Sequence, residues 1–303
     1  MKRTIILCAL VLLTLTSCNH TPESKGENKV QTTPNGTLTF RNGHSEVNGI
    51  KMYYEIYGMG DPLVLVHGGG STIQSNFGKA IPLLAKNRQV IAMELQAHGR
   101  TGDRDADLSF EQDADDVAML LKNLGIDKAD FFGFSNGGTT TLQIAIRHPE
   151  MVNKIIVGSA LAKRHGVPEW FWGFMDNARL ENMPEQLKEA YLKVAPDPKG
   201  LQIMHDKDAK RMVNFKDIPD TMIEAIKAPT LIIIADRDVI TLEHAIEVHR
   251  QIANSELAII PGGHGEYIGE ITTLNQGFVE NGLIAIPMIE KFLDQKKVEK
   301  KRP

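Results

Sequence analysis

The chain has 303 residues, of which 42% are hydrophobic and 24% are charged, and this composition is typical of a globular protein. The length is enough for one large α/β domain or two smaller ones. A formal net charge of −4 gives no electrostatic basis for binding nucleic acid or an anionic membrane surface. We find no internal repeat.

Residues 1–17 have the features of an export signal. Met1-Lys2-Arg3 precedes an apolar run from Ile5 to Leu15, which is too short to span a membrane. The run closes with Leu15-Thr16-Ser17-Cys18, which resembles the lipobox of bacterial lipoproteins. The resemblance implies cleavage before Cys18, lipid attachment to this residue, and a location on a membrane of the bacterial cell envelope. The alternative is an ordinary signal peptide and a soluble secreted or periplasmic protein.

Cysteine usage agrees with an exported chain. The two cysteines are Cys8, inside the apolar run, and Cys18, at the proposed cleavage point. The folded domain is therefore expected to contain no disulfide and no thiolate metal site. Residues 18–36 are polar and contain Pro, Gly, Ser and Thr, so we expect a flexible tether between membrane and domain.

From residue 37 to residue 160, apolar runs alternate with amphipathic stretches. Strands are expected at 45–47, 50–57, 63–66, 89–93 and 154–157, several of them continuous apolar runs typical of strands buried on both faces. Helices are expected at 76–85, 110–124 and 139–147, the second of which begins at a capping-box pattern, Ser109 to Gln112. The alternation predicts a mostly parallel sheet with helices on both faces.

This alternation stops between residues 161 and 226, where helical patches occur without a buried strand. It resumes with strands at 228–235 and 256–260 and helices at about 242–252 and 284–293. We therefore expect residues 37–160 and 227–295 to form the core, residues 161–226 a helical cap, and residues 296–303 a polar tail.

A serine motif lies at the end of one apolar strand. Gly133-Phe-Ser-Asn-Gly137 follows the expected short strand Asp130-Phe-Phe132 and precedes a helix. The Gly-x-Ser-x-Gly pattern describes a serine on a strained strand-to-helix turn, where neighbouring side chains must be small. Ser135 is then exposed, and the helix N-terminus offers backbone N–H groups to a developing negative charge.

A serine hydroxyl needs a base within hydrogen-bond reach, and the base needs a third group to orient it. Open α/β sheets place such groups at the carboxyl ends of strands. One later strand ends in Ala235-Asp-Arg-Asp238, and the last ends in Pro261-Gly-Gly-His264-Gly265. The chain order is thus serine, acid, histidine, which is the order of α/β-hydrolases.

Taken together, these segments resemble the α/β-hydrolase superfamily of serine hydrolases over roughly residues 46–293. His67-Gly-Gly-Gly70 resembles the oxyanion loop, and Glu94-Leu-Gln-Ala-His-Gly-Arg-Thr101 resembles the loop after strand 4. Glu94 and Ala97 stand where Asp and Gly are usual, at positions that are structural in relatives. The resemblance implies the α/β-hydrolase fold, with a mostly parallel eight-stranded sheet, helices on both faces and a helical cap insertion.

The resemblance also implies roles for individual residues. Ser135 is the expected nucleophile, and His264 the expected general base and then acid. Asp238 is the expected orienting acid, because in the family the acid lies three residues beyond the small residue that ends the strand. Asp236 is the competing candidate, as a turn residue or a partner of Arg237. The expected oxyanion donors are the backbone N–H groups of Gly69 and Asn136, with His67 bracing its loop.

The cap is the expected source of substrate contacts. Trp170, Trp172 and Phe174 concentrate aromatic surface there and are candidate substrate-binding residues, although these rings could instead only join the cap to the core. The stretch Glu266–Gly282 is longer than usual and either walls the site or forms a surface loop.

No metal or cofactor is expected. His244 and His249 are five residues apart, which does not put them on one helical face. Gly68-Gly-Gly70 lacks both the Lys-Ser/Thr of a phosphate loop and the third glycine of a dinucleotide fingerprint.

The expected function is hydrolysis of a small carboxylic ester or lactone with an apolar part, through an acyl-enzyme on Ser135. Relatives by motif also cleave carbon–carbon bonds, amides or thioesters, so the triad does not fix the bond. A different class of function, a catalytically silent ligand-binding protein on the same fold, is the remaining alternative.

Overall fold

The computed structural model describes residues 28–33, 36–274 and 283–296. The expected signal peptide, Cys18, the first part of the expected tether and nearly all of the polar tail lie outside them. No helix in the described ranges is both long and apolar enough to cross a membrane.

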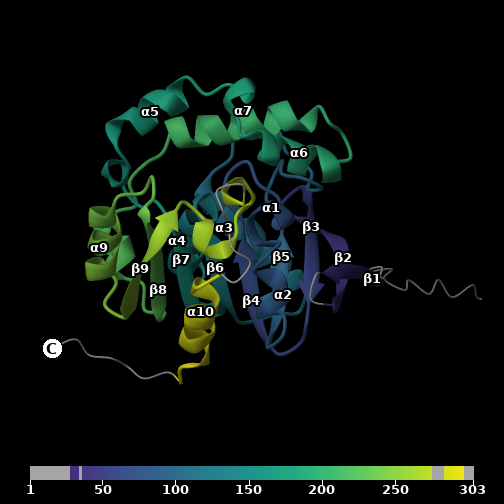
Figure 1. Cartoon of the computed structure of the whole chain (residues 1–303), viewed down its shortest axis with the longest axis horizontal. Coiled ribbons are helices and arrows are strands. Elements are labelled where there is room, and N and C mark those ends of the chain that lie inside the picture. The colour runs from purple at the N-terminus through teal and green to yellow at the C-terminus, as the bar shows by residue number, and fades with distance from the viewer. Residues whose placement is uncertain (1–27, 34–35, 275–282, 297–303) are drawn as a thin grey trace, which may run out of the picture.

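A single twisted sheet of nine strands runs through the described chain, in the order β1-β2-β3-β5-β4-β6-β7-β8-β9 (Figure 1). The strands β1 to β3 pair antiparallel, and β3 also pairs antiparallel with β5. From β5 to β9 every neighbouring pair is parallel. The strand bounds are β1 Asn28–Thr33, β2 Gly36–Val47, β3 Ile50–Tyr57, β4 Asp61–Val66, β5 Arg88–Met93, β6 Ala129–Phe134, β7 Val152–Gly158, β8 Thr230–Arg237 and β9 Ser255–Gly263.

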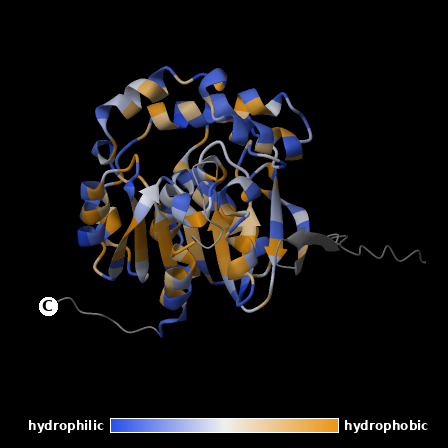
Figure 2. Ribbon diagram, viewed as in Figure 1, coloured by the Kyte–Doolittle hydropathy of each residue, from blue (hydrophilic) through white to orange (hydrophobic). Residues whose placement is uncertain are grey.

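Helices cover both faces of this sheet. On one face Val117, Leu142 and Val248 belong to the same buried cluster as strand residues of the sheet. On the other face Phe77 and Ile289 belong to a second cluster. Figure 2 shows the resulting concentration of hydrophobic residues in the central strands. The core helices are α1 Ile73–Phe77, α2 Ile81–Leu84, α3 Phe110–Asn123, α4 Asn136–Arg147, α9 Leu242–Gln251 and α10 Ala285–Asp294.

The segment between β7 and β8 is helical, and Figure 1 shows its larger helices arching over one end of the sheet. Strand β6 runs into Ser135 at that same end, so the arch lies over the turn that carries the serine. The helices of this segment, which we call the cap, are α5 Glu169–Asp176, α6 Glu185–Val194, α7 Gly200–Val213 and α8 Asp220–Glu224.

The fold departs from the sequence expectation in two places. Asn28–Thr33, within the stretch expected to be a flexible tether, pairs with β2 as an edge strand, in keeping with its β-branched Val30, Thr32 and Thr33. The helix expected at 76–85 is instead two short helices, α1 and α2. Pro82 explains this break, because it stands in the first turn of α2 and has no N–H to continue a longer helix.

Candidate active site

Ser135 occupies the sharp turn between β6 and α4, with φ 56° and ψ −124°. L-residues rarely adopt this conformation, and the packing around it explains the flanking glycines. A Cβ on Gly133 would lie 2.0 Å from the carbonyl oxygen of Gly137, and one on Gly137 would lie 2.1 Å from that of Val66. The pattern therefore marks a strained turn that only glycine neighbours permit.

Three side chains from three strand ends meet at this turn. The Nε2 of His264 lies 3.1 Å from the Oγ of Ser135, and its Nδ1 lies 2.7 Å from Oδ1 of Asp238. The competing acid, Asp236, accepts the backbone N–H of Gly262 and is nearly half exposed. The structure thus joins Ser135, His264 and Asp238 in one hydrogen-bonded chain and leaves Asp236 outside it.

Charge within this chain favours a basic imidazole. Burial lowers the pKa of His264, but the Asp238 carboxylate outweighs burial through its charge and its hydrogen bond, so the pKa lies above the ordinary value. Burial raises the pKa of Asp238, yet His264 and the donor Ser159 bring it below its usual range. Asp238 is therefore ionised, and it orients the Nδ1–H of His264 so that Nε2 faces Ser135.

Two backbone N–H groups beside Ser135 have no acceptor among the described residues, namely those of Gly69 and Asn136. Both residues line the same cavity as Ser135. His67 holds the loop behind them, as expected: its Nδ1–H donates to the carbonyl of Gly68 and its Nε2 accepts the N–H of Leu95. Burial lowers the pKa of His67 to about 3, so this brace is neutral. Such free N–H groups can stabilise an oxyanion.

Sequence reasoning missed the group that holds Asp238. The Oγ of Ser159, after β7, donates to Oδ2 of Asp238 at 2.6 Å and lies 2.8 Å from the hydroxyl of Tyr267. Ser159 has a φ of 48°, a positive value for a residue that is not glycine. Nothing in the local sequence marks either residue. Of the two alternatives for Glu266–Gly282, a surface loop is wrong for the described part, because Tyr267 and Ile268 are buried.

A cavity of about 310 Å³ opens beside Ser135 and His264. Phe174 lines it, as expected, together with Phe171 from the same helix. The expectation was wrong for Trp170, which is exposed, and for Trp172, which is buried with its Nε1 donating to the carbonyl of Arg164. Flexible apolar side chains line the cavity instead, namely Leu161, Met175, Met183, Leu187, Met204 and Met212. Arg179, which is exposed, also lines it, and its side chain makes no ion pair or hydrogen bond with a described residue.

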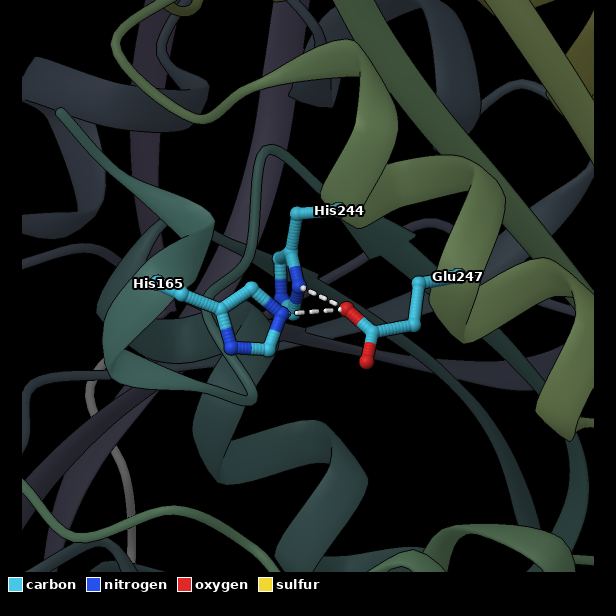
Figure 3. A group of neighbouring side chains, drawn as sticks. All are labelled: His165, His244 and Glu247. Atoms are coloured by element: carbon cyan, nitrogen blue, oxygen red, sulfur yellow. Dashed lines mark hydrogen bonds and ion pairs between the residues drawn. The ribbon is translucent and has the colours of Figure 1, made fainter.

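A second cluster has the residue types of a metal site, His165, His244 and Glu247 (Figure 3). Both imidazoles contact the same carboxylate oxygen, at 2.7 Å and 3.2 Å. The Nε2 of His244 accepts the backbone N–H of Ala162, so its Nδ1 must carry the proton that it shares with Glu247. That nitrogen has no lone pair for a metal ion, and the cluster instead ties the start of the cap to α9.

Comparisons with known proteins agree with this architecture. A family model described as alpha/beta hydrolase fold matches residues 61–209. The serine hydrolase BPHL of Homo sapiens is 26% identical over 263 residues, 77% of this chain and 84% of that protein. The 2-hydroxy-6-oxo-2,4-heptadienoate hydrolase of Pseudomonas putida strain F1 is 28% identical over 255 residues, 76% of this chain and 91% of that protein. The solved structure of Est816, described as an N-acyl homoserine lactone degrading enzyme, is 27% identical with a TM-score of 0.61, covering 78% of this chain and 100% of that one.

The chain has the α/β-hydrolase fold, and the expectation of that fold is confirmed. The relatives matched over most of this chain are hydrolases by name, and the chain is similar to them in sequence.

Proposed function

We propose that the protein is a serine hydrolase of small carboxylic esters or lactones with an apolar part, acting through an acyl-enzyme on Ser135. The observation that carries the proposal is the hydrogen-bonded chain from Asp238 through His264 to Ser135, beside a cavity with apolar walls. Est816, a lactone-degrading enzyme by its description, has the same fold and is matched over its full length, which supports the lactone as one substrate class.

In this mechanism His264 accepts the Ser135 proton as the hydroxyl attacks the substrate carbonyl. The carbonyl oxygen becomes an oxyanion, which the N–H groups of Gly69 and Asn136 stabilise. His264 then protonates the leaving alcohol, which in a lactone stays attached to the acyl group. A water molecule deprotonated by His264 attacks the acyl-enzyme and releases the carboxylic acid and Ser135. The apolar cavity holds the hydrocarbon part of the substrate and excludes bulk water.

A fluorophosphonate probe tests the nucleophile. It should label the wild type and a surface control, Ser45→Ala, but not Ser135→Ala. Equal labelling of Ser135→Ala would contradict the assignment. Labelling of the wild type without turnover across a panel of esters, lactones, amides and diketones would instead favour a silent binding protein.

One observation favours a second candidate, cleavage of a carbon–carbon bond in a substrate that bears a carboxylate. Arg179, an exposed residue, lines a mostly apolar cavity without an ion-pair partner in the described chain, and a substrate carboxylate would give it one. The Pseudomonas putida relative acts on a dienoate, by its name. Steady-state assays of 2-hydroxy-6-oxo-2,4-heptadienoate beside p-nitrophenyl butyrate distinguish the two, and a kcat/KM for the dienoate that exceeds that for the ester and falls in Arg179→Ala would support this candidate.

A further inference from the structure

A buried carboxylate of the cap contacts the oxyanion loop of the core. Asp208 lies on α7, and its Oδ2 accepts the backbone N–H of Gly70 at 2.5 Å. The same oxygen accepts a hydrogen bond from Nε2 of His98 at 2.9 Å, and Oδ1 accepts one from Arg211. Asp208 also lines the cavity that holds Ser135.

The partners of His98 fix its charge. Its Nδ1 lies 2.8 Å from the carbonyl oxygen of Gln96, and its Nε2 faces the Asp208 carboxylate. Both partners are acceptors, so both ring nitrogens carry protons and the imidazole is cationic. Burial lowers the pKa of His98, but Asp208 outweighs this and holds it above the ordinary value. Asp208 is thus an anion between two cations, His98 and Arg211, which limits its repulsion of a nearby oxyanion.

The Gly70 contact fixes one side of the oxyanion hole. The peptide between Gly69 and Gly70 is held by Asp208 at its N–H and by the Ser71 hydroxyl, which donates to the Gly69 carbonyl at 3.1 Å. The preceding peptide is held at the carbonyl of Gly68 by His67. The Gly69 N–H belongs to this preceding peptide and has no acceptor among the described residues, and its direction depends on how both peptides that meet at the Gly69 Cα are held. Gly70 has a φ of +66°, which glycine adopts without strain, so its backbone can turn the Gly70 N–H toward Asp208.

We propose that Asp208 is a positioning residue of the oxyanion hole, through which the docked cap sets the direction of the Gly69 N–H. This inference rests on the proposed function, because it requires that reaction at Ser135 forms an oxyanion at Gly69 and Asn136. Its consequence is that the cap completes the catalytic site as well as covering it. Without Asp208 the substrate still enters the cavity, but the transition state loses stabilisation.

The test compares two inhibitors that differ in oxyanion formation. A trifluoromethyl ketone with a butyl chain adds to Ser135 and places an oxyanion in the hole, whereas the matching methyl ketone binds without it. We call the affinity for the trifluoromethyl ketone divided by that for the methyl ketone the affinity ratio. In Asp208→Ala this ratio should fall about tenfold or more. Loss of a whole oxyanion donor costs roughly 10²–10³-fold, and a misdirected donor should cost part of that. The kcat for p-nitrophenyl butyrate should fall with this ratio, while KM changes little.

Matched variants separate this role from cap stability. Lys210→Ala removes a different ion pair between α7 and the core, the one between Lys210 and Asp107. This pair does not contact the oxyanion loop, so the variant should keep the wild-type affinity ratio. Asp208→Ser should behave like Asp208→Ala, since its hydroxyl is too short to reach Gly70, and it serves if the alanine variant does not fold. Asp208→Asn retains an acceptor oxygen and should restore most of the ratio.

The outcomes are distinct from those of the proposed function. A wild-type affinity ratio in a folded Asp208→Ala or Asp208→Ser variant would overturn the inference while leaving the serine hydrolase intact. A wild type that neither reacts with fluorophosphonate nor prefers the trifluoromethyl ketone would overturn the proposed function first. An equal loss of ratio in Lys210→Ala would show that cap docking in general is responsible, and would also overturn the role of Asp208.

Discussion

The hydroxyl of Ser159 donates a hydrogen bond to Oδ2 of Asp238, while the opposite oxygen of the same carboxylate holds Nδ1 of His264. Since the single Ser159 proton goes to Asp238, the hydroxyl of Tyr267 must donate to Ser159. Burial raises the pKa of Tyr267 well above its ordinary value, which keeps this donor protonated. A buried relay of two hydroxyls therefore fixes the rotamer of the acid.

Removing the Ser159 hydroxyl should slow turnover. In Ser159→Ala the Asp238 carboxylate loses the hydrogen bond that the hydroxyl donates. A hydrogen bond to a charged group contributes about 1.5–3 kcal/mol, and we expect kcat to fall roughly tenfold. Tyr267→Phe should give a smaller decrease, because Ser159 still contacts Asp238. The control is Tyr191→Phe, which removes a buried hydroxyl that contacts the carbonyl of Ala97 instead. Steady-state assays and thermal melts check the order, and an unchanged kcat in folded Ser159→Ala would refute it.

The pH dependence of kcat/KM should report His264. The general base must be neutral, and its pKa is raised, so activity should be lost as the pH falls through a value above the usual 6.5. In Asp238→Asn burial still lowers the pKa but the carboxylate charge is gone, so the acid limb should move to lower pH and kcat should fall by several orders of magnitude. In Asp236→Asn the acid limb should stay at its wild-type pH and kcat should stay at its wild-type value. An acid limb that shifts in Asp236→Asn alone would assign the orienting acid to the other aspartate.

The sequence carried most of the information for the fold and for the reacting groups. Strand periodicity and glycine turns are local properties, and they located β4, β6 and β8 as well as the turns that bear Ser135 and Asp238. The supports of these groups could not be predicted, because Ser159, Tyr267 and Asp208 meet their partners only through tertiary packing. An aspartate on a cap helix has no local pattern that distinguishes a buried carboxylate from a solvated one.

The prediction of the residues that line the cavity was wrong in part, for a related reason. The side chains Trp170, Phe171, Trp172 and Phe174 share one short helix, and a helix turns each of them in a different direction. Composition indicated an aromatic wall, but of these four rings the helix presents only Phe171 and Phe174 to the cavity, beside Met175. Met183, Met204 and Met212, which supply much of the remaining wall, lie on other cap segments, at positions that the sequence does not distinguish from ordinary packing.

Stability should depend on pH through His98. Its pKa in the folded protein is raised, so its contribution is fully present below the unfolded value of 6.5 and is lost as the pH rises through the folded value. The facing groups are Asp208, Arg211, His67 and the carbonyl of Gln96. His98→Gln cannot titrate, so the difference in unfolding free energy between wild type and variant should shrink above pH 6.5. Denaturant melts from pH 6 to pH 9 measure it, and a difference that is constant across this range would contradict a cationic His98.

Ala97 lies in a conformation that suits glycine. Its φ is +64°, and a left-handed backbone costs an L-residue about 1–2 kcal/mol. Glycine avoids this strain, but its greater conformational freedom in the unfolded chain offsets part of the gain in stability. Ala97→Gly should therefore stabilise the protein by about 0.5–1 kcal/mol. The same change within helix α6, Ala190→Gly, should destabilise it by about 1 kcal/mol. Denaturant unfolding of the two variants checks the opposite signs, and a loss of stability in Ala97→Gly would show that the Ala97 methyl group contributes more by packing than the strain costs.

Membrane association should depend on Cys18. We propose that residues 1–17 are removed and that lipid on Cys18 anchors the domain to a membrane of the cell envelope, on the basis of the Leu-Thr-Ser-Cys pattern after the apolar run. In Cys18→Ser the protein should leave the detergent-soluble membrane fraction, since no lipid can be attached, while Cys8→Ser should remain there. Fractionation of cells that express each variant, with an immunoblot of soluble and membrane pools, measures this. Retention of Cys18→Ser in the membrane pool at the wild-type level would disprove the lipid anchor, and a wild type that is wholly soluble would favour an ordinary secreted hydrolase.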